Sequence, residues 1–240
     1  MKILIVGASG ATGKLLVAQL LSAGHRLKII VRTTSNVPEA WSSNEYISLI
    51  RVNHITEISA HEMEVYLKDC EAVASCLGHN PNFKGIYGKP KKLVTDMVQL
   101  ICETILKNAP EKSIGFVLMN TAGNSNRDLN EPVSFGQKIM IGLLRLLLPP
   151  HPDNEKAADY LRQKIGQSNP FIEWVAVRPD SLIDLEKVTT YSLHASPTRS
   201  ALFNPGQTSR INVAHFMAQL LTDQAIWKNW KGQMPVIYNG

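Results

Sequence analysis

Residues 2–14 read KILIVGASGATGK, an apolar run that ends in three glycines with the spacing GxxGxxG. The apolar run predicts a strand, and the residues that follow predict a helix over 12–23. Glycine permits the sharp turn between them and leaves room for a pyrophosphate against the backbone, while the first amides and the positive dipole of the helix attract phosphate. The stretch therefore predicts a dinucleotide-binding loop.

A P-loop is the main alternative for a glycine-rich turn between a strand and a helix. It requires a glycine five residues before the Gly13-Lys14 pair and a hydroxyl residue directly after it. Ala8 and Leu15 occupy those two positions. The sequence therefore argues against a P-loop nucleotide site.

Short β-branched runs alternate with longer helical periods along the rest of the chain, a pattern typical of parallel strands joined by helical crossovers. We expect an α/β fold, a Rossmann-type doubly wound and mostly parallel sheet, as a single domain over residues 1–240 with a small C-terminal substrate-side region. The expected strands cover 2–6, 27–31, 46–52, 72–76, 114–119 and 174–177, with a last edge strand at 236–238. The other expected helices cover 57–68, 92–108, 154–165 and 213–221.

The composition is that of an ordinary globular chain, because 44% of the 240 residues are hydrophobic and 19% are charged. The net charge is +5, but the basic residues are scattered, so we expect no nucleic-acid partner. Cys70, Cys76 and Cys102 form no CxxC pair and have no set of histidines around them at the spacing of a metal site. They predict buried free thiols in a reducing compartment and no metal site.

Residues 139–148 form the most apolar run, which contains Arg145, ends at Pro149 and is about half as long as a membrane span. We expect a packed core helix here, with contact to a membrane surface or to a second subunit of a homo-oligomer as the alternatives. The apolar run at 3–6 is too short for a signal peptide. The sequence thus predicts a soluble cytoplasmic protein without stable membrane insertion.

Lysines at positions 84, 89, 91 and 92 form the densest basic stretch. The interspersed Gly85, Gly88 and Pro90 predict a solvated loop, and capture of a phosphate or a substrate is the alternative. The loops over 79–90 and 120–132 are long for an α/β fold, so we expect them to form walls of a binding site.

The end of the second expected strand selects between the two nicotinamide dinucleotides, since a carboxylate there binds ribose hydroxyls and a basic residue accepts a 2′-phosphate. Residues 31–35 read VRTTS, and no acidic residue follows until Glu39. Arg32 can pair with phosphate and stack on adenine, and nearby hydroxyls can add hydrogen bonds. The sequence therefore favours NADP(H) over NAD(H) as cofactor.

Five segments together resemble the atypical short-chain dehydrogenase/reductases. They are GASGATGK after KILIV, VRTTSNVP at 31–38, SCLG at 75–78, NTAG at 120–123 and WVAVRPDSL at 174–182. Within these enzymes the chain is most similar to the NAD(P)-binding NmrA-like group, which includes biliverdin-IXβ reductase and flavin reductase. The resemblance covers nearly the whole chain.

The resemblance implies a set of cofactor contacts along the expected carboxyl edge of the sheet. It implies that the pyrophosphate is lined by Gly7, Ser9, Gly10, Ala11, Thr12 and Gly13, and that the 2′-phosphate meets Arg32 with Thr34 or Ser35. Asn53 and His54 stand where the family usually has Gly-Asp beside the adenine. On the nicotinamide side it implies Cys76, Leu77, Gly78, Thr121 in the place of the family's serine, Pro179 and Ser181.

A proton donor is harder to assign. Ordinary short-chain dehydrogenases use a tyrosine with a lysine four residues later, and Tyr160 and Lys164 have that spacing. The family register instead places Lys156 at the lysine position and Pro152 at the tyrosine position. The first catalytic candidates are therefore Lys156 and Thr121, which could position a polar group of the substrate, and the Tyr160 pair is the alternative. His79 and His151 are further candidate acids, because imidazole titrates near neutral pH.

Without a tyrosine acid, the acceptor must need little help from the protein to take up a proton. We therefore expect an NADPH-dependent oxidoreductase that transfers hydride to a small conjugated acceptor of flavin, quinone or tetrapyrrole type. A non-catalytic dinucleotide sensor of the NmrA type is the alternative. A sugar-nucleotide epimerase or dehydratase is disfavoured, because that chemistry depends on the tyrosine.

Overall fold

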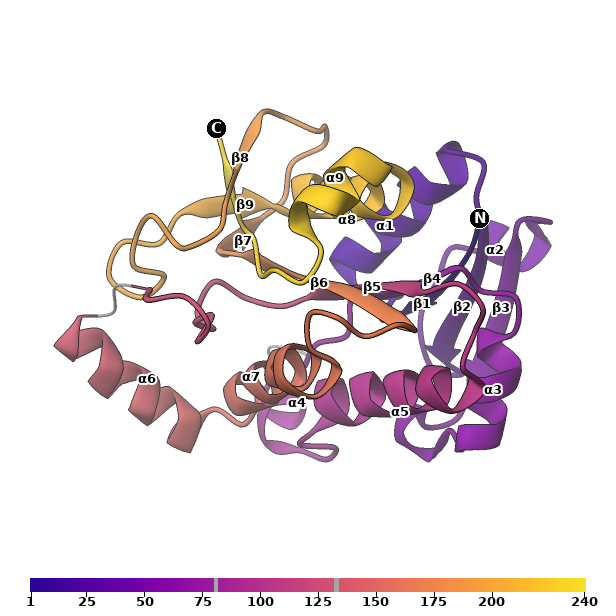
Figure 1. Cartoon of the computed structure of the whole chain (residues 1–240), viewed down its shortest axis with the longest axis horizontal. Helices are drawn as coiled ribbons and strands as arrows, with labels where there is room; N and C mark the ends of the chain where they lie inside the picture. Colours follow the sequence, from indigo (N-terminus) through magenta and orange to yellow (C-terminus); the bar gives the residue numbers. More distant parts are fainter. Residues whose placement is uncertain (80–81, 132–133) are drawn as a thin grey trace.

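The computed structural model describes residues 1–79, 82–131 and 134–240. Its main sheet has eight strands in the order β3-β2-β1-β4-β5-β6-β10-β8 (Figure 1). The pairs are parallel except for β8, which runs antiparallel to β10. The chain winds outward from β1 in one direction and from β4 in the other, which confirms the Rossmann-type sheet.

Each of the strands β1 to β6 begins and ends within three residues of the bounds expected from the sequence. The bounds of all eight strands of the main sheet follow. They are β1 Lys2–Val6, β2 Arg26–Arg32, β3 Ile47–Val52, β4 Ala72–Ser75, β5 Ile114–Met119, β6 Ile172–Pro179, β8 Tyr191–His194 and β10 Val236–Asn239. A second, two-stranded sheet pairs β7 (Ser181–Ile183) with β9 (Gln207–Ser209).

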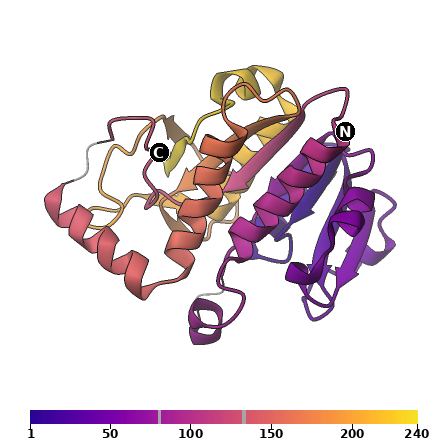
Figure 2. The same cartoon turned by 60° about the horizontal axis from the view of Figure 1, so that its bottom comes forward.

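Helices cover both faces of the main sheet (Figure 1), and Figure 2 shows α5 and α7 lying across one of them. One layer holds α3 (Ala60–Leu67), α5 (Leu93–Asn108) and α7 (Pro150–Asp159), and the other holds α1 (Ala11–Ser22), α8 (Arg210–Thr222) and α9 (Gln224–Trp230). Alternate residues of β1 supply the two cores: Leu4 packs in the cluster with the α5 residue Ile101, and Ile5 in the cluster with the α8 residue Phe216. The short helix α2 (Ala40–Ser43) buries Trp41 in the same core cluster as α1 and α8. The short α4 (Phe83–Tyr87) and the longer α6 (Phe135–Leu147) lie outside these layers.

Two expected helices have different bounds, for local reasons. Residues 55–57 form a separate 3-10 turn, and α3 starts only after Ser59, because Ser59 and Glu62 form a reciprocal capping box. The helix expected over 154–165 starts earlier, at Pro150, because proline suits the first helical turn. It ends as a π-helical turn over Tyr160–Ile165.

The last strand was expected at the sheet edge, and this expectation is wrong. β10 lies between β6 and β8 and is buried along Val236–Tyr238. β8, which the sequence pattern did not predict, forms the edge, because residues 191–194 return antiparallel to β10.

The expectation of a packed core helix at 139–148 is also wrong. In α6 the side chains of Ile139, Leu143, Leu146 and Leu147 are exposed, and among the side chains that the structure describes in this helix only that of Ile141 is buried. The helix projects from the body of the molecule (Figure 1) and is held against α7 by the ion pair of Arg145 with Glu155. Its apolar face therefore lacks the neighbouring layer that a core helix needs.

The remaining expectations concern cysteines, metal and membrane. All three cysteines are free thiols; Cys70 and Cys102 are buried as expected, whereas Cys76 is only half-buried. Over the described ranges, no group of three or more potential ligand side chains could hold a metal ion. No helix found there has the length and apolar character to cross a bilayer.

Candidate functional site

A cavity of about 480 Å³ lies at the carboxyl ends of β1, β2 and β4, where the direction of strand winding changes. The glycine loop forms one side, through Gly7, Ser9 and Gly10. The segments that follow β2, β3 and β4 and the α4 segment form the others. The predicted site residues among them are Arg32, Ser35, His54, Cys76, Leu77, Gly78 and His79. In a doubly wound sheet this is the place where ligands bind.

Close backbone packing holds the glycine loop in place. A Cβ atom on Gly7 would lie 2.4 Å from the carbonyl carbon of Cys76, and one on Gly13 would lie 2.3 Å from the carbonyl oxygen of Gly7. Gly7 also has φ +76°, a conformation that disfavours other residues. β1, the loop and α1 can therefore approach one another only with glycine at both positions.

The start of α1 is open toward the cavity. Its N-cap residue is Gly10, which has no side chain to accept a hydrogen bond from the first amides. Ala11 follows as the first helical residue and is exposed, whereas Thr12 and Gly13 are buried. Free amides at the positive end of a helix suit a pyrophosphate, so the loop fits the dinucleotide predicted from its sequence.

The lining of the cavity is basic. It includes the exposed side chains of Arg32 and Lys89 together with His54 and His79, and its described part includes no acidic residue. Thr34 and Asn53 do not line the cavity; both are exposed, and Asn53 accepts a hydrogen bond from Thr33. An anionic group is therefore favoured here.

The lysine-rich stretch differs from the expected solvated loop. Residues 83–87 form α4, and Asn82, Gly85, Lys89 and Pro90 line the cavity. The two expected binding walls cover residues 79–90 and 120–132. Residues 80–81 of the first wall and residue 132 of the second lie outside the described residues.

His79 joins the cavity wall to the buried residue Asp153 of α7. The Nε2 atom of His79 is 2.8 Å from an Asp153 carboxylate oxygen, and its Nδ1 atom is 3.1 Å from the carbonyl oxygen of Gly85. The hydrogen bond to Asp153 raises the pKa of His79 above its ordinary value of 6.5, against the opposing effect of burial. A protonated imidazole can donate to both oxygens at once.

Asp153 also accepts hydrogen bonds from the amides of Val94 and Thr95 at 2.9 Å, in the first turn of α5. Burial opposes its ionisation, but the hydrogen bonds from His79, Thr95 and Val94 prevail and lower its pKa. Asp153 therefore remains a carboxylate that holds α4, α5 and α7 together. No sequence pattern predicted it, because one acidic residue in a first helical turn is common.

The predicted nicotinamide-side residues beyond β4 do not line this cavity. Thr121 is half-buried after β5, and its hydroxyl oxygen accepts a hydrogen bond from the Gly123 amide at 3.2 Å. Pro179 is buried at the end of β6, and Ser181 is exposed in β7. Their contacts with a cofactor remain predictions.

The candidate proton donors lie in different surroundings. A Cβ atom on Gly123 would be 3.7 Å from the Thr121 hydroxyl and 3.8 Å from a ring carbon of His151, so these two groups are neighbours. His151 faces Glu155. Burial raises the pKa of Glu155, but its contacts with His151 and Arg145 prevail and lower that pKa to about 2. Lys156 is exposed on α7.

Tyr160 packs against the core beside α5, and Lys164 is exposed on the π-helical turn. Burial, with the nearby Cys102 and Glu103, raises the pKa of Tyr160 to about 12. The tyrosine of ordinary short-chain dehydrogenases needs a lowered pKa, so the surroundings of Tyr160 weigh against the alternative pair.

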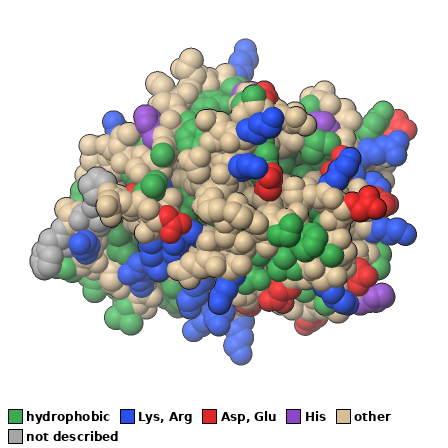
Figure 3. All heavy atoms as spheres, viewed as in Figure 1, with side chains coloured by type: hydrophobic (Ala, Val, Ile, Leu, Met, Phe, Trp, Pro, Cys, Tyr) green, Lys and Arg blue, Asp and Glu red, His purple; other side chains and the backbone are tan. Residues whose placement is uncertain are grey.

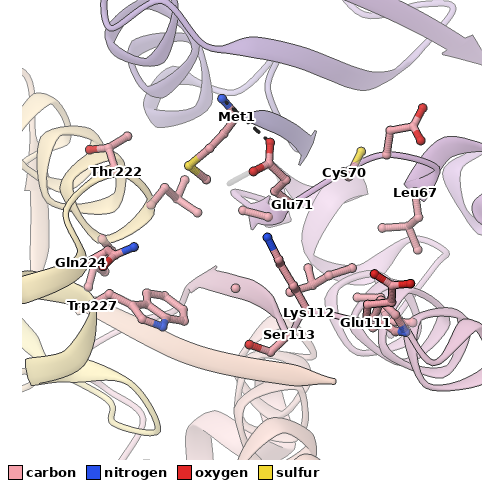
Figure 4. Close-up of a pocket in the computed structure, with 18 of the residues that line it drawn as sticks. Met1, Leu67, Cys70, Glu71, Glu111, Lys112, Ser113, Thr222, Gln224 and Trp227 are labelled. Carbon is pink, nitrogen blue, oxygen red and sulfur yellow. Dashed lines mark ion pairs between the residues drawn. The ribbon is translucent and has the colours of Figure 1, made fainter. Parts of the chain in front are cut away.

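A larger cavity, of about 790 Å³, lies at the opposite edge of the sheet (Figure 4). It is lined by the starts of β4 and β5, by Trp227 of α9 and by Glu71 and Lys112. No glycine loop lines it, so the smaller cavity is the better candidate for a dinucleotide.

Residues 7–224 match the model of a family described as NAD(P)H-binding. The chain belongs to this NAD(P)H-binding family. An Arabidopsis thaliana protein described as uncharacterized and chloroplastic is 33% identical over 82 residues, a match that covers 34% of this chain and 29% of that protein. The match thus spans less than a third of this relative's length.

Solved structures of similar fold extend over the full chain. A proposed NADH-flavin reductase from Streptococcus pneumoniae has a TM-score of 0.67 at 18% identity, with 100% of both chains covered. A short-chain dehydrogenase/reductase from Veillonella parvula, in complex with NADP, has a TM-score of 0.68 at 16% identity, with 99% of this NAD(P)H-binding chain and 94% of the other covered. The anaerobillin reductase ChuY from Escherichia coli has a TM-score of 0.67 at 13% identity, covering 100% and 97%.

Proposed function

We propose that this NAD(P)H-binding protein is an NADPH-dependent reductase that passes hydride to a flat conjugated acceptor of flavin, quinone or tetrapyrrole type. One observation carries the proposal: the cavity runs from the open start of α1 to Arg32, and its described lining is basic without an acidic residue. The neighbour of the same fold that binds NADP supports this choice of cofactor by analogy.

In this proposal each part of the cavity has a binding role. The amides at the start of α1 bind the pyrophosphate, and Arg32 with Ser35 binds the 2′-phosphate. His54 lies against the adenine side, and Lys89 adds positive charge on the α4 side. Thr34 and Asn53 are next to the cavity residues Ser35 and His54 in the sequence and would contribute further hydrogen bonds to the cofactor. The proposal does not depend on either of them.

The nicotinamide supplies the hydride when the cofactor is bound. Cys76, Leu77 and Gly78 continue from β4 along the cavity and would hold the reacting end in place. Tyr160 is partly buried against the core and has a raised pKa, so it is not the proposed acid. The acceptor is therefore one whose reduced form takes its proton from solvent or from His151, while Thr121 positions a polar group of the acceptor.

The test is NADPH oxidation by the purified protein with FMN, a soluble quinone or biliverdin, followed by absorbance of the reduced nicotinamide. We expect turnover with at least one acceptor and none without acceptor. NADPH binding without oxidation by any of the three would contradict the reductase and favour the sensor. Failure to bind NADPH would contradict the assignment of the cavity itself.

A further inference from the structure

The exposed face of α6 is apolar along the length of the helix. Leu146 is 79% exposed, Leu147 57%, Ile139 52% and Leu143 44%. A surface helix normally turns such a stripe toward the core. Four large aliphatic side chains on one projecting helix indicate a surface that meets another apolar phase.

A second apolar group lies at the same edge of the molecule. Phe83 of α4 is 79% exposed and stacks at 4.9 Å between ring centroids on Tyr87, which is 45% exposed. Helices α4 and α6 follow β4 and β5, which are neighbouring parallel strands, so both helices leave the carboxyl edge of the sheet. Figure 2 shows both helices protruding at this end. We call these six side chains the apolar rim: Phe83, Tyr87, Ile139, Leu143, Leu146 and Leu147.

The surroundings of the apolar rim are basic. No acidic residue occurs between positions 82 and 95 or between 134 and 152 of the sequence. Lys89, Lys91, Lys92 and Lys138 are exposed in these segments and form no ion pair with a described residue. Figure 3 shows hydrophobic side chains over α6 at the lower left and Lys and Arg side chains along the lower edge beside them.

We propose that the apolar rim docks this protein on the surface of an anionic lipid bilayer. Exposed aliphatic and aromatic side chains flanked by lysines are the combination that inserts into a bilayer interface and pairs with anionic headgroups. Helix α6 would lie flat in the interface, since its 13 residues are too few to cross the membrane.

A second copy of the chain fits this surface less well. A symmetric contact through α6 would place Lys138 and the lysines near α4 close to their own copies, and neither segment offers a carboxylate to neutralise them. An anionic bilayer supplies the opposite charge over the whole face. The cavity wall formed by α4 lies at the same edge, so docking would bring an acceptor dissolved in the bilayer close to the site.

The experiment is flotation of the full-length protein with vesicles of phosphatidylcholine, alone or mixed with phosphatidylserine. We expect binding to the mixed vesicles, weakened by added salt, and about fivefold weaker binding for Lys138→Glu. The double variant Leu146→Glu/Leu147→Glu should bind at least about tenfold more weakly. Val65→Glu on α3 is the matched control, because Val65 is 54% exposed at the other end of the molecule and should leave binding unchanged.

All these variants should bind NADPH in solution as tightly as wild type does. Loss of vesicle binding with normal NADPH binding therefore concerns the apolar rim alone, and absence of NADPH binding in wild type concerns the proposed function alone. Equal flotation of wild type and the double variant would overturn the proposal. So would absence of flotation with both vesicle types. A dimer in solution that the double variant dissociates, without vesicle binding, would assign the apolar rim to a second copy instead.

Discussion

Gly7 and Gly24 share a backbone conformation but differ in what surrounds them. Their φ angles are +76° and +77°. A Cβ atom on Gly24 would meet nothing within 4 Å, whereas one on Gly7 would lie within 2.5 Å of three backbone atoms of Cys76 and Leu77. At Gly24 the chain needs only the left-handed backbone, but at Gly7 it also needs the empty space.

This difference predicts unequal effects of the same substitution. Gly24→Ala should lower the free energy of unfolding by about 1–2 kcal/mol, the cost of a left-handed backbone for alanine. Gly7→Ala should cost more and weaken NADPH binding as well, because β1 and β4 must move apart. Urea unfolding and a fluorescence titration with NADPH measure both effects. Equal losses of stability, with binding intact in both variants, would contradict this account of the loop.

At the scale of elements, α7 acts as the anchor for segments distant in the sequence. Asp153 binds the first turn of α5 and His79 near α4, and Glu155 binds Arg145 of α6. Residues 79 and 153 are 74 positions apart, so only the fold brings them together. The stability of the cavity wall therefore depends on the charge of His79.

The pKa of His79 is raised in the folded protein, so its protonation stabilises the fold. This contribution is complete below the unfolded-state pKa of about 6.5 and is lost as pH rises through the raised folded-state pKa. We expect His79→Gln to lower the free energy of unfolding near pH 6 and to have a smaller effect near pH 9, as measured by urea unfolding at each pH. His61→Gln, on the exposed side of α3, is the matched control. An effect of His79→Gln that is independent of pH would contradict a charged His79.

At the scale of the whole molecule, Arg178 joins the sheet to the C-terminal region. The side chain is fully buried in β6 and donates to the carbonyl oxygens of Met234, Asn124 and Ala195 at 2.6–3.0 Å. It also pairs with the buried carboxylate of Glu131 at 2.7 Å. One guanidinium therefore connects four segments that are separate in the sequence.

Removal of Arg178 leaves a buried carboxylate and three carbonyl oxygens without partners. Arg178→Met should lower the free energy of unfolding by about 3–5 kcal/mol, the typical cost of removing one partner of a buried ion pair. The double variant with Glu131→Gln should lose less than the sum of the two single variants, since both changes remove the same pair. Additive losses in thermal or urea unfolding would show that the pair does not act as a unit.

The parts of the fold that the sequence could predict are those set by local periodicity. The strand at 114–119 has the expected bounds, and the glycine loop follows from the spacing of Gly7, Gly10 and Gly13. The position of β10 between β6 and β8 could not be predicted, because a short apolar strand does not specify its partners. The exposed face of α6 was missed for a similar reason, since periodicity predicts an apolar face but not its neighbour.

The candidate site divides in the same way. Arg32 could be predicted to lie at the cavity because it ends a strand beside the glycine loop. Asp153 could not, because its partners His79, Val94 and Thr95 are 74, 59 and 58 positions away in the sequence. The roles of Thr121, Lys156 and the other proton-donor candidates stay predictions.

The most direct test of the account is NADPH and NADH binding by wild type and Arg32→Ala. Arg26→Ala, an exposed arginine at the other end of β2, is the matched control. Loss of a charged hydrogen bond should weaken NADPH binding of Arg32→Ala by about 1.5–3 kcal/mol and leave NADH binding nearly unchanged, whereas Arg26→Ala should bind both cofactors as wild type does. Equal weakening for NADPH and NADH, or none, would remove Arg32 from the phosphate site and contradict the account.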